Sequence, residues 1–295
     1  MKIPKQLYPF DGHFLNLNGL RYHYLDEGSG DPVVMLHGNP TWSFYYRELV
    51  MALRNSLRTI VPDHMGCGLS DKPNDQHYDY TLHRRVDDLE ALLEHLKIKE
   101  NITLVLHDWG GMIGMAYAVR HVRSISRIVI LNTAAFHKPP GKSFPWLLWL
   151  TRDTAAGAFL VLRFNAFSRL ATRICCRRKQ MPKHVRDAYC APYGENSIAT
   201  LRFVQDIPLR PGDRSYDLVR EVEEKLPLFS HLPVLICWGE KDFVFDRHFL
   251  GRWTRIFPRA DVHRLPRCGH YVLEDATEEI ITFVQKFLKE HPLPS

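Results

Sequence analysis

The stretch from Leu104 to Gly111, with the sequence LVLHDWGG, has the pattern of a buried strand that ends in a sharp turn and continues as a helix over 112–121. Such a turn, a nucleophile elbow, pushes one side chain out above the edge of a sheet. The usual pattern is G-x-S-x-G, but here the exposed position carries Asp108 and no serine lies nearby. The sequence therefore predicts a strand–turn–helix unit that presents a carboxylate at its turn.

A carboxylate at this position narrows the chemistry. A hydroxyl has to lose its proton to a base before it attacks an acyl carbon, whereas an aspartate is already ionised at neutral pH and can attack an electrophile directly. Asp108 therefore suits a halogenated carbon, an epoxide or a strained lactone better than an ordinary ester.

Short β-rich runs alternate with helical patterns along most of the chain. In the helix expected over 84–96, for example, apolar residues recur with a period near 3.6. The expected strands are 33–36, 59–61, 102–106, 128–131, 234–238 and 261–265, and the other expected helices are 44–53, 112–121 and 278–288. This alternation predicts an α/β fold with a mostly parallel sheet and helices on both faces.

The alternation stops between about His137 and Leu228, where the sequence reads as helical and irregular. We interpret residues 137–228 as a helical cap inserted into a main domain formed by 1–136 and 229–295. The first half of the cap is rich in large apolar side chains, which suit packing on the main domain, a lid over an apolar pocket or contact with a membrane. These side chains include Phe144, Trp146, Leu147, Leu148, Trp149, Leu150, Phe159, Leu160, Leu162, Phe164 and Phe167.

Positive charge is concentrated in the same part of the chain. The formal net charge is +6, but eleven lysines and arginines lie between Lys138 and Arg186 against one acid, Asp153. A solvated helix face is the simplest interpretation, and an anionic membrane surface or an acidic partner protein are the alternatives. Nucleic acid is disfavoured because no recognition motif accompanies the charge.

The compartment is constrained by three absences in the sequence. The first residues lack an apolar run after their charges, no run of eighteen apolar residues occurs, and the six cysteines include no C-x-x-C pair. We therefore expect a cytoplasmic protein with reduced cysteines, without a secretory signal or a spanning helix. Neither a metal nor a cofactor is expected.

Two candidates complete a catalytic group with Asp108. His270 lies in a glycine-containing loop between the last expected strand and the closing helix, and Asp242 directly follows the strand 234–238. This matches the chain order nucleophile, acid, histidine. Glu240 is a rival acid, and Asn132 occupies the other position where an acid can stand. Because an amide cannot stabilise an imidazolium as a carboxylate does, we assign the acid to Asp242.

Asn39 and Trp109 are candidates for binding a developing anion. The loop after 33–36 and the residue after the nucleophile normally supply the backbone N–H groups of an oxyanion hole. Here the side chains of Asn39 and Trp109 add an amide and an indole N–H that could point at a leaving halide or carboxylate. The alternative is that Trp109 fills core and Asn39 forms a turn.

Two further patterns carry less weight. The segment 66–71, GCGLSD, lacks the lysine and the following helix of a phosphate loop, so a structural turn is favoured. Tyr189, Tyr193 and Tyr216 lie in the cap, where paired tyrosines would polarise an epoxide oxygen, but packing is the preferred interpretation.

These motifs resemble the haloalkane dehalogenase branch of the α/β-hydrolase superfamily. HGNP at 37–40, PDHMGCGLSDKP at 62–73 and HDWGG at 107–111 match its patterns, and the likeness covers nearly the whole chain. Asn39 and Trp109 combined with Asp242 look like the third subfamily, which contains the β-lactone decarboxylases of bacterial long-chain olefin biosynthesis. Further segments are similar to that group: 131–136, 203–209, 242–250 and 269–275. One departure is Leu106, which stands where the general elbow has a glycine.

The resemblance implies an α/β-hydrolase fold with an eight-stranded sheet and an inserted cap. It also implies conversion of a long-chain cis-3,4-dialkyl β-lactone into a cis-alkene and carbon dioxide. Asp108 would attack the ring, with attack at the carbonyl preferred. Asn39 and Trp109 would hold the developing charge, and His270, oriented by Asp242, would activate a water that regenerates Asp108. The basic cap would dock on the inner membrane surface or on other enzymes of the olefin pathway.

Three other functions remain open. The same five residues would serve a haloalkane dehalogenase, in which Asp108 displaces halide and His270 activates water. Epoxide hydrolysis is the third possibility for the same nucleophile. A receptor that binds a lipid without turnover is disfavoured, because nucleophile, acid and histidine are all present.

Overall fold

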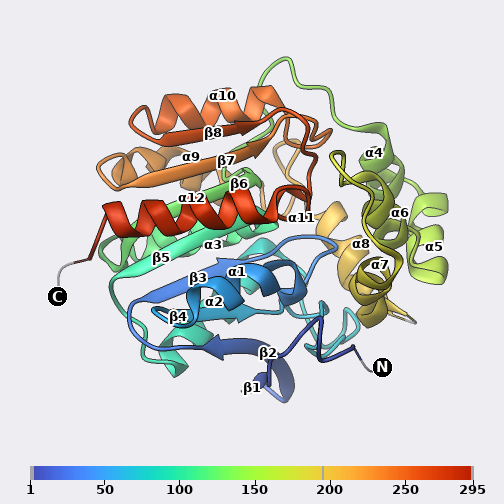
Figure 1. Cartoon of the computed structure of the whole chain (residues 1–295). Helices are drawn as coiled ribbons and strands as arrows, with labels where there is room; N and C mark the ends of the chain where they lie inside the picture. The colour runs from blue at the N-terminus through green and yellow to red at the C-terminus, as the bar shows by residue number, and fades with distance from the viewer. Residues whose placement is uncertain (1–2, 195, 294–295) are drawn as a thin grey trace.

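The computed structural model describes residues 3–194 and 196–293 and contains one eight-stranded sheet with helices on both faces (Figure 1). The strand order is β1-β2-β4-β3-β5-β6-β7-β8. The first two strand pairs are antiparallel and the remaining pairs are parallel, which confirms the predicted fold class. The strands are β1 His13–Leu17, β2 Leu20–Glu27, β3 Pro32–Leu36, β4 Arg58–Pro62, β5 Ile102–Asp108, β6 Ile125–Thr133, β7 Val234–Gly239 and β8 Asp261–Leu265.

The hairpin of β1 and β2 was missing from the expected strands. Its turn is Asn18-Gly19, and both residues have positive φ angles, 54° and 87°. Such a two-residue turn matches the right-handed twist of paired strands. The hairpin closes one edge of the sheet and lies far from the strands that carry the candidate site (Figure 1).

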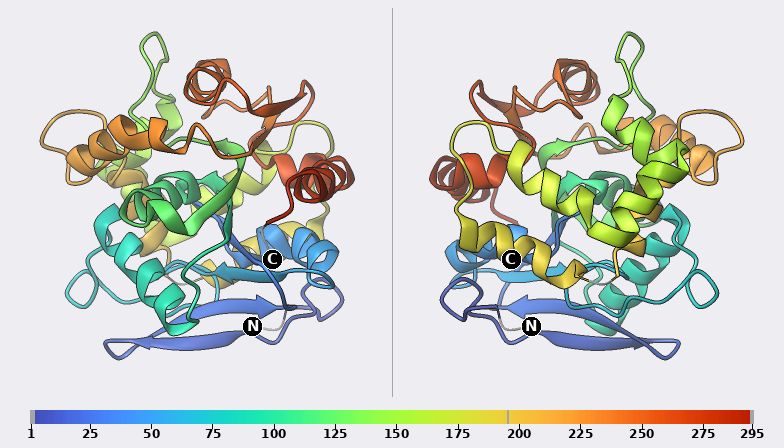
Figure 2. Two further views of the ribbon diagram at one scale, coloured as in Figure 1. Left: turned by 90° about the vertical axis from the view of Figure 1, so that its left-hand side faces the viewer. Right: turned by 90° about the vertical axis from the view of Figure 1, so that its right-hand side faces the viewer.

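Helices cover the sheet in two layers (Figure 2). Helices α1 and α12 pack together on one face of the sheet, and α2, α3 and α9 form a row on the other face. The bounds of these five helices are α1 Arg47–Leu53, α2 Leu82–His95, α3 Trp109–Arg120, α9 Tyr216–Lys225 and α12 Thr277–Glu290. Two further helices, α10 Arg247–Ile256 and α11 Val272–Asp275, lie between β7 and α12 in the chain. Because both faces are covered, β5 is buried along its whole length and reads as a continuous apolar run.

The register of the central strands brings their carboxyl ends to one edge. Leu36 of β3 pairs with Leu106 of β5, and Leu131 of β6 pairs with Cys237 of β7. Residues that directly follow these strands are therefore gathered at the same edge, which is where ligands bind in open α/β sheets.

The segment between β6 and β7 lies beyond this edge. Within the described residues it has helices and no strand: α4 Trp146–Asp153, α5 Ala155–Phe164, α6 Ala166–Ile174, α7 Lys183–Cys190, α8 Ile198–Gln205 and then α9. Helices α4 to α8 gather over the strand ends (Figure 1), whereas α9 packs against α3. The division into domains at 137 and 228 stays a prediction.

Four short 3-10 helices complete the described chain: η1 Ser43–Tyr46, η2 Val122–Ser124, η3 Ala191–Tyr193 and η4 Leu226–Phe229. The helix expected over 44–53 is thus divided into η1 and α1. No helix in the described part of the chain is long and apolar enough to span a membrane.

Candidate functional site

The elbow is formed as the sequence predicts, at the junction of β5 and α3. Asp108 has φ 51° and ψ −125°, a backbone conformation that non-glycine residues rarely adopt. The turn also requires Gly110, because a Cβ atom there would collide with the carbonyl oxygen of Leu36. Leu106 stands where the general elbow has a glycine, and its side chain packs against Gly114 of α3. A Cβ atom at Gly114 would collide with that side chain.

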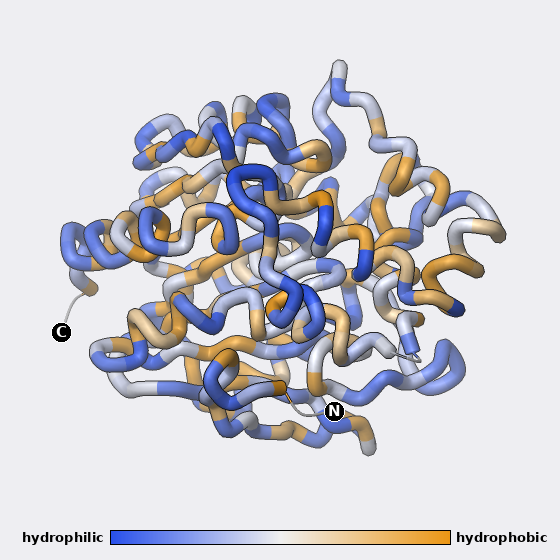
Figure 3. Tube along the Cα trace, turned by 45° about the vertical axis from the view of Figure 1, so that its right-hand side comes forward, coloured by the Kyte–Doolittle hydropathy of each residue, from blue (hydrophilic) through white to orange (hydrophobic). Residues whose placement is uncertain are grey.

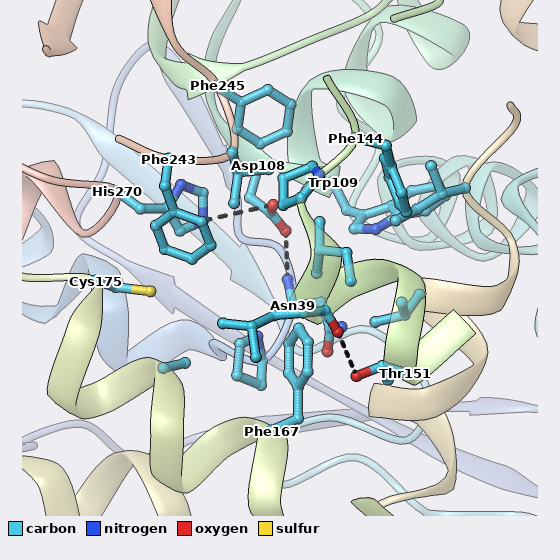
Figure 4. Close-up of a pocket in the computed structure, with 18 of the residues that line it drawn as sticks. Asn39, Asp108, Trp109, Phe144, Thr151, Phe167, Cys175, Phe243, Phe245 and His270 are labelled. Carbon is cyan, nitrogen blue, oxygen red and sulfur yellow. Dashed lines mark hydrogen bonds and ion pairs between the residues drawn. The ribbon is translucent and has the colours of Figure 1, made fainter. Parts of the chain in front are cut away.

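The two carboxylate oxygens of Asp108 have different surroundings (Figure 4). Oδ1 accepts the backbone N–H of Asn39 at 2.6 Å, and Oδ2 lies 3.5 Å from Nε2 of His270. Burial raises the pKa of Asp108 above its ordinary value, while His270 and the backbone N–H groups of Asn39 and Trp109 act in the opposite direction. One oxygen is therefore held by the main chain, and the other faces His270.

His270 lies in the loop between β8 and α11 and is buried. Its Nδ1 is 2.8 Å from Oδ2 of Asp242, and the ring of Phe245 stacks on the imidazole with centroids 5.7 Å apart. Burial lowers the pKa of His270, but the charge and hydrogen bond of Asp242 outweigh it, so the pKa is raised above its ordinary value. The histidine thus has one nitrogen on Asp242 and the other facing Asp108.

Asp242 rather than Glu240 reaches this histidine. Its Oδ1 accepts the backbone N–H groups of Val244 at 2.7 Å and Phe245 at 3.1 Å, which leaves Oδ2 to His270. Glu240 points to the surface, where it lies 3.4 Å from Arg264. The structure therefore brings Asp108, His270 and Asp242 together, as the chain order predicts; their catalytic roles stay predictions.

Asn132 holds Asp242 in place, which was not predicted from the sequence. Its Nδ2 donates to Oδ2 of Asp242 and to the carbonyl of Gly239, each at 3.0 Å, and its Oδ1 accepts the N–H of Gly239 at 2.7 Å. Asn132 is a buried residue near the end of β6 and has a positive φ of 39°. It was considered only as a substitute acid, whereas it holds the acid that is present.

Asn39 and Trp109 both line the cavity above Asp108 (Figure 4). One side-chain N–H of Asn39 donates to the carbonyl of Thr200 on α8 at 3.0 Å. The indole of Trp109 packs on Phe203 with ring centroids 5.3 Å apart, and Arg85 lies 3.7 Å over that phenyl ring. Both side chains are thus fixed by α8; their part in anion binding stays a prediction.

The cavity above Asp108 is apolar and has a volume of about 240 Å³. Its floor carries Asp108, Asn39, Trp109 and His270, and its walls come mainly from α4, α5, α6 and the segments 136–148 and 204–209. The lining includes Phe144, Leu147, Leu148, Leu160, Phe167, Ile174, Val204, Phe243 and Phe245. The walls are mostly apolar, with His137, Lys138, Lys142 and Thr151 as the polar exceptions, so they suit hydrocarbon chains.

The remaining candidates have structural contacts. Tyr189 donates to Glu274 at 2.6 Å and Tyr193 to the carbonyl of Thr41 at 2.8 Å, and the ring of Tyr216 packs on His137; none of the three lines the cavity. The segment 66–71 forms a turn in which the N–H of Leu69 donates to buried Asp63. Among the described residues, no cluster of His, Cys, Asp or Glu is arranged to hold a metal.

Comparison with known proteins gives relatives over almost the whole chain. The family model described as the alpha/beta hydrolase fold matches residues 31–277. A Shewanella oneidensis protein named cis-3-alkyl-4-alkyloxetan-2-one decarboxylase is 58% identical over 286 residues, covering 96% of this chain and 90% of that protein. A Xanthomonas campestris protein of the same name is 47% identical over 284 residues, covering 93% and 94%.

Haloalkane dehalogenases are more distant relatives. Haloalkane dehalogenase 2 of Mycobacterium bovis is 31% identical over 276 residues, covering 93% of this chain and 94% of that protein. The solved structure of haloalkane dehalogenase DatA from Agrobacterium tumefaciens superimposes with a TM-score of 0.85 at 22% identity, covering 96% and 97% of the two chains. At that identity the likeness shows the fold alone.

Proposed function

The chain belongs to the α/β-hydrolase fold family, and from this premise we propose that it converts cis-3-alkyl-4-alkyloxetan-2-ones into cis-alkenes and carbon dioxide. The observation that carries the proposal is the Asp108 carboxylate on the floor of an apolar cavity, with Oδ2 facing His270. The activity named for relatives at 58% and 47% identity supports the choice of substrate.

Asp108 is the proposed nucleophile, and two atoms of the lactone ring are open to it. Attack at the carbonyl carbon breaks the acyl C–O bond and forms a mixed anhydride. His270 then protonates the departing oxygen and activates a water that hydrolyses the anhydride. This releases Asp108 and a 3-hydroxy acid, so the carbonyl route forms no alkene. Attack at the ring carbon that carries the oxygen forms an alkyl ester and frees the ring carboxylate. Carbon dioxide then leaves, its bonding electrons form the double bond, and the ester C–O bond breaks to restore Asp108.

Negative charge develops on the substrate in both routes. The backbone N–H of Asn39 is already bonded to Oδ1 of Asp108, so it positions the nucleophile. The indole of Trp109 and the second side-chain N–H of Asn39 are the proposed donors to the departing oxygen. Fixing these donors through Thr200 and Phe203 lowers the reorganisation that the reaction needs.

A paired assay tests the proposal. Purified protein is given a synthetic cis-3,4-dialkyl β-lactone and, separately, 1-bromoalkanes of matched length. We expect alkene and carbon dioxide from the lactone to form faster than bromide is released. Faster bromide release would favour hydrolytic dehalogenation, the second candidate, which the 31% identical relatives support.

We further propose that the cap rests on an anionic lipid surface. Helices α4 and α5 expose Trp146 (69%), Trp149 (51%), Phe159 (59%) and Phe164 (50%), and the same helices line the cavity. The hydropathy along the trace is shown in Figure 3. Exposed basic residues occur at the end of α5 and in the segments that follow it: Arg163, Arg169, Arg173, Arg177, Arg178, Lys179 and Lys183. Aromatic side chains partition to the membrane interface, and each basic residue near an anionic surface contributes about 1 kcal/mol. Leu160 is both exposed and cavity-lining, which suits entry of a lipid-borne substrate.

Vesicle flotation tests the lipid surface. We expect binding to vesicles that contain phosphatidylglycerol at low salt, and weaker binding as salt screens the charges. The double variant Trp146→Ser and Trp149→Ser should lose binding. Phe14→Ser, which removes an exposed aromatic side chain on β1, is the matched control and should keep it. Absence of binding at low salt would leave a partner enzyme of the same pathway, or solvent, as the neighbour of the cap.

A further inference from the structure

The buried carboxylate of Asp275, at the end of α11, collects backbone N–H groups from two separate segments. Its Oδ2 accepts from Gly269 at 2.7 Å and from Arg177 at 2.8 Å. Its Oδ1 accepts from Arg178 at 3.1 Å and from Lys179 at 3.4 Å. Across 3–194 and 196–293 it has no ion-pair partner, so main-chain dipoles offset its charge. One carboxylate therefore joins the connection between α6 and α7 to the loop before His270.

A second contact joins the same two segments. The N–H of Tyr271 donates to the carbonyl of Cys175 at 3.0 Å, and a Cβ atom at Gly269 would collide with that carbonyl. The carbonyl of His270 itself lies 2.9 Å from Nε2 of His107. The backbone on both sides of His270 is thus bonded to the cap or to Asp275, and Cys175 borders the same side of the cavity as His270 (Figure 4).

We propose that Asp275 is a positioning residue that couples the seating of the cap to the placement of His270. The proposal rests on the proposed function only in giving His270 a part in turnover. The end of α6 lines the cavity through Ile174 and Cys175, so the segment that contacts substrate also fixes the catalytic loop. Displacement of that segment moves His270 away from Asp242 and from Asp108, and a misplacement near 1 Å can cost about a hundredfold in rate.

The test is Asp275→Asn. The amide keeps the size of the side chain but replaces one acceptor oxygen with an NH2 group that faces backbone donors, so about two of the four bonds are lost. We expect kcat to fall by roughly ten- to a hundredfold with KM changed by less than about twofold. Titration of the His270 ring by NMR, assigned with His270→Ala, should show a lowered pKa. The reason is that looser contacts with Asp242 and Asp108 weaken the interactions that raise this pKa against burial.

The substitution itself replaces none of the groups that contact the His270 ring. The titratable groups packed around its ring and loop are Asp108, Asp242, His107, Tyr271 and Cys175. The matched control is Glu279→Gln, which removes the acid that binds the Arg178 side chain at 2.5 Å and leaves the backbone bonds intact. The control should have the kcat and the His270 titration of the wild type.

Each outcome is decisive. If Asp275→Asn lowers only the melting temperature and leaves kcat and the His270 titration unchanged, Asp275 merely holds the fold and the proposal is wrong. If Asp275→Asn does not fold, Gly269→Ala takes its place, because its Cβ forces the loop away from Cys175. A lower kcat and a lowered pKa of His270 in Gly269→Ala would support the coupling. A wild-type kcat and a wild-type titration of His270 would overturn it. Lack of lactone turnover by the wild type counts against the proposed function alone, since the titration needs no substrate.

Discussion

Asn132 donates a side-chain N–H to Oδ2 of Asp242 at 3.0 Å, the same oxygen that bonds His270. The acid is therefore shared between an amide from β6 and the histidine after β8. A neutral donor at this position stabilises the charge of Asp242 without competing for the proton of His270. A second carboxylate there would instead add negative charge beside the imidazole.

Asn132→Asp should accordingly move the acid limb of the kcat–pH profile to higher pH. If His270 acts as a base, activity rises as it loses its proton, and the added carboxylate favours the protonated ring and raises its pKa. The control is Glu240→Gln. Glu240 lies on the loop that carries Asp242 but pairs with Arg264 at the surface, so this variant should leave the acid limb in place. A limb that stays put, or moves to lower pH, in a folded Asn132→Asp protein would contradict this arrangement.

Asp108→Asn should abolish turnover while preserving the fold. The amide oxygen can keep the hydrogen bond from Asn39, and its NH2 group then faces His270, so packing is retained but the nucleophilic oxygen is gone. We expect kcat to fall by about three orders of magnitude or more, as for other lost nucleophiles. Thermal unfolding checks the fold, and Asp108→Ala should be equally inactive. Activity near the wild-type level in either variant would remove Asp108 from the mechanism.

His270→Ala should allow a covalent adduct on Asp108 to accumulate. The carboxylate attacks without a proton transfer, whereas water-dependent release of the adduct needs a base. Intact-mass analysis after incubation with a 1-bromoalkane, whose ester only water can release, should show the protein plus the alkyl group. With the β-lactone, an adduct should accumulate only if Asp108 attacks the carbonyl carbon. His263→Ala, on the partly exposed strand β8, is the control and should accumulate none. Full activity in His270→Ala, without an adduct, would rule out the hydrolytic step.

The central features of the site were accessible from the sequence because each has a local signal. A carboxylate at the elbow, an acid after β7 and a histidine in the loop after β8 each stand directly beside a recognisable strand. Asn18-Gly19 is an equally local hairpin signal, so β1 and β2 could have been predicted from the sequence.

Other features depend on contacts between distant segments. Asn132 and Asp242 are separated by 110 residues, and Asp275 is 98 residues from Arg177. The sequence around an asparagine at a strand end, or around an aspartate in a short helix, does not indicate which distant residue it will contact. The apolar half of the cap was visible in composition, but which of its side chains line the cavity and which face outward depends on how α4 to α6 pack.

Asp63 provides a test of stability that is independent of substrate. It is buried and accepts hydrogen bonds from the backbone N–H groups of Ser43 at 2.6 Å and Leu69 at 2.8 Å, and it pairs with His23. Burial raises its pKa, but the charge and hydrogen bond of His23, with smaller contributions from His37 and Leu69, lower it to about 2. An unfolded aspartate titrates near pH 4, so the carboxylate stabilises the fold above that value. This contribution is lost as pH falls toward 2.

The unfolding free energy of the wild type should therefore lose about 1 kcal/mol more than that of Asp63→Asn between pH 5 and pH 3. The variant lacks the titrating group and should also be less stable at pH 7, because an amide cannot accept all the hydrogen bonds that the carboxylate accepts. Urea unfolding at pH 7, 5 and 3 measures both effects. Asp11→Asn, which alters an exposed acid near the N-terminus, should follow the wild type. Equal pH slopes for the wild type and Asp63→Asn would show that His23 and the backbone donors do not hold this carboxyl group ionised.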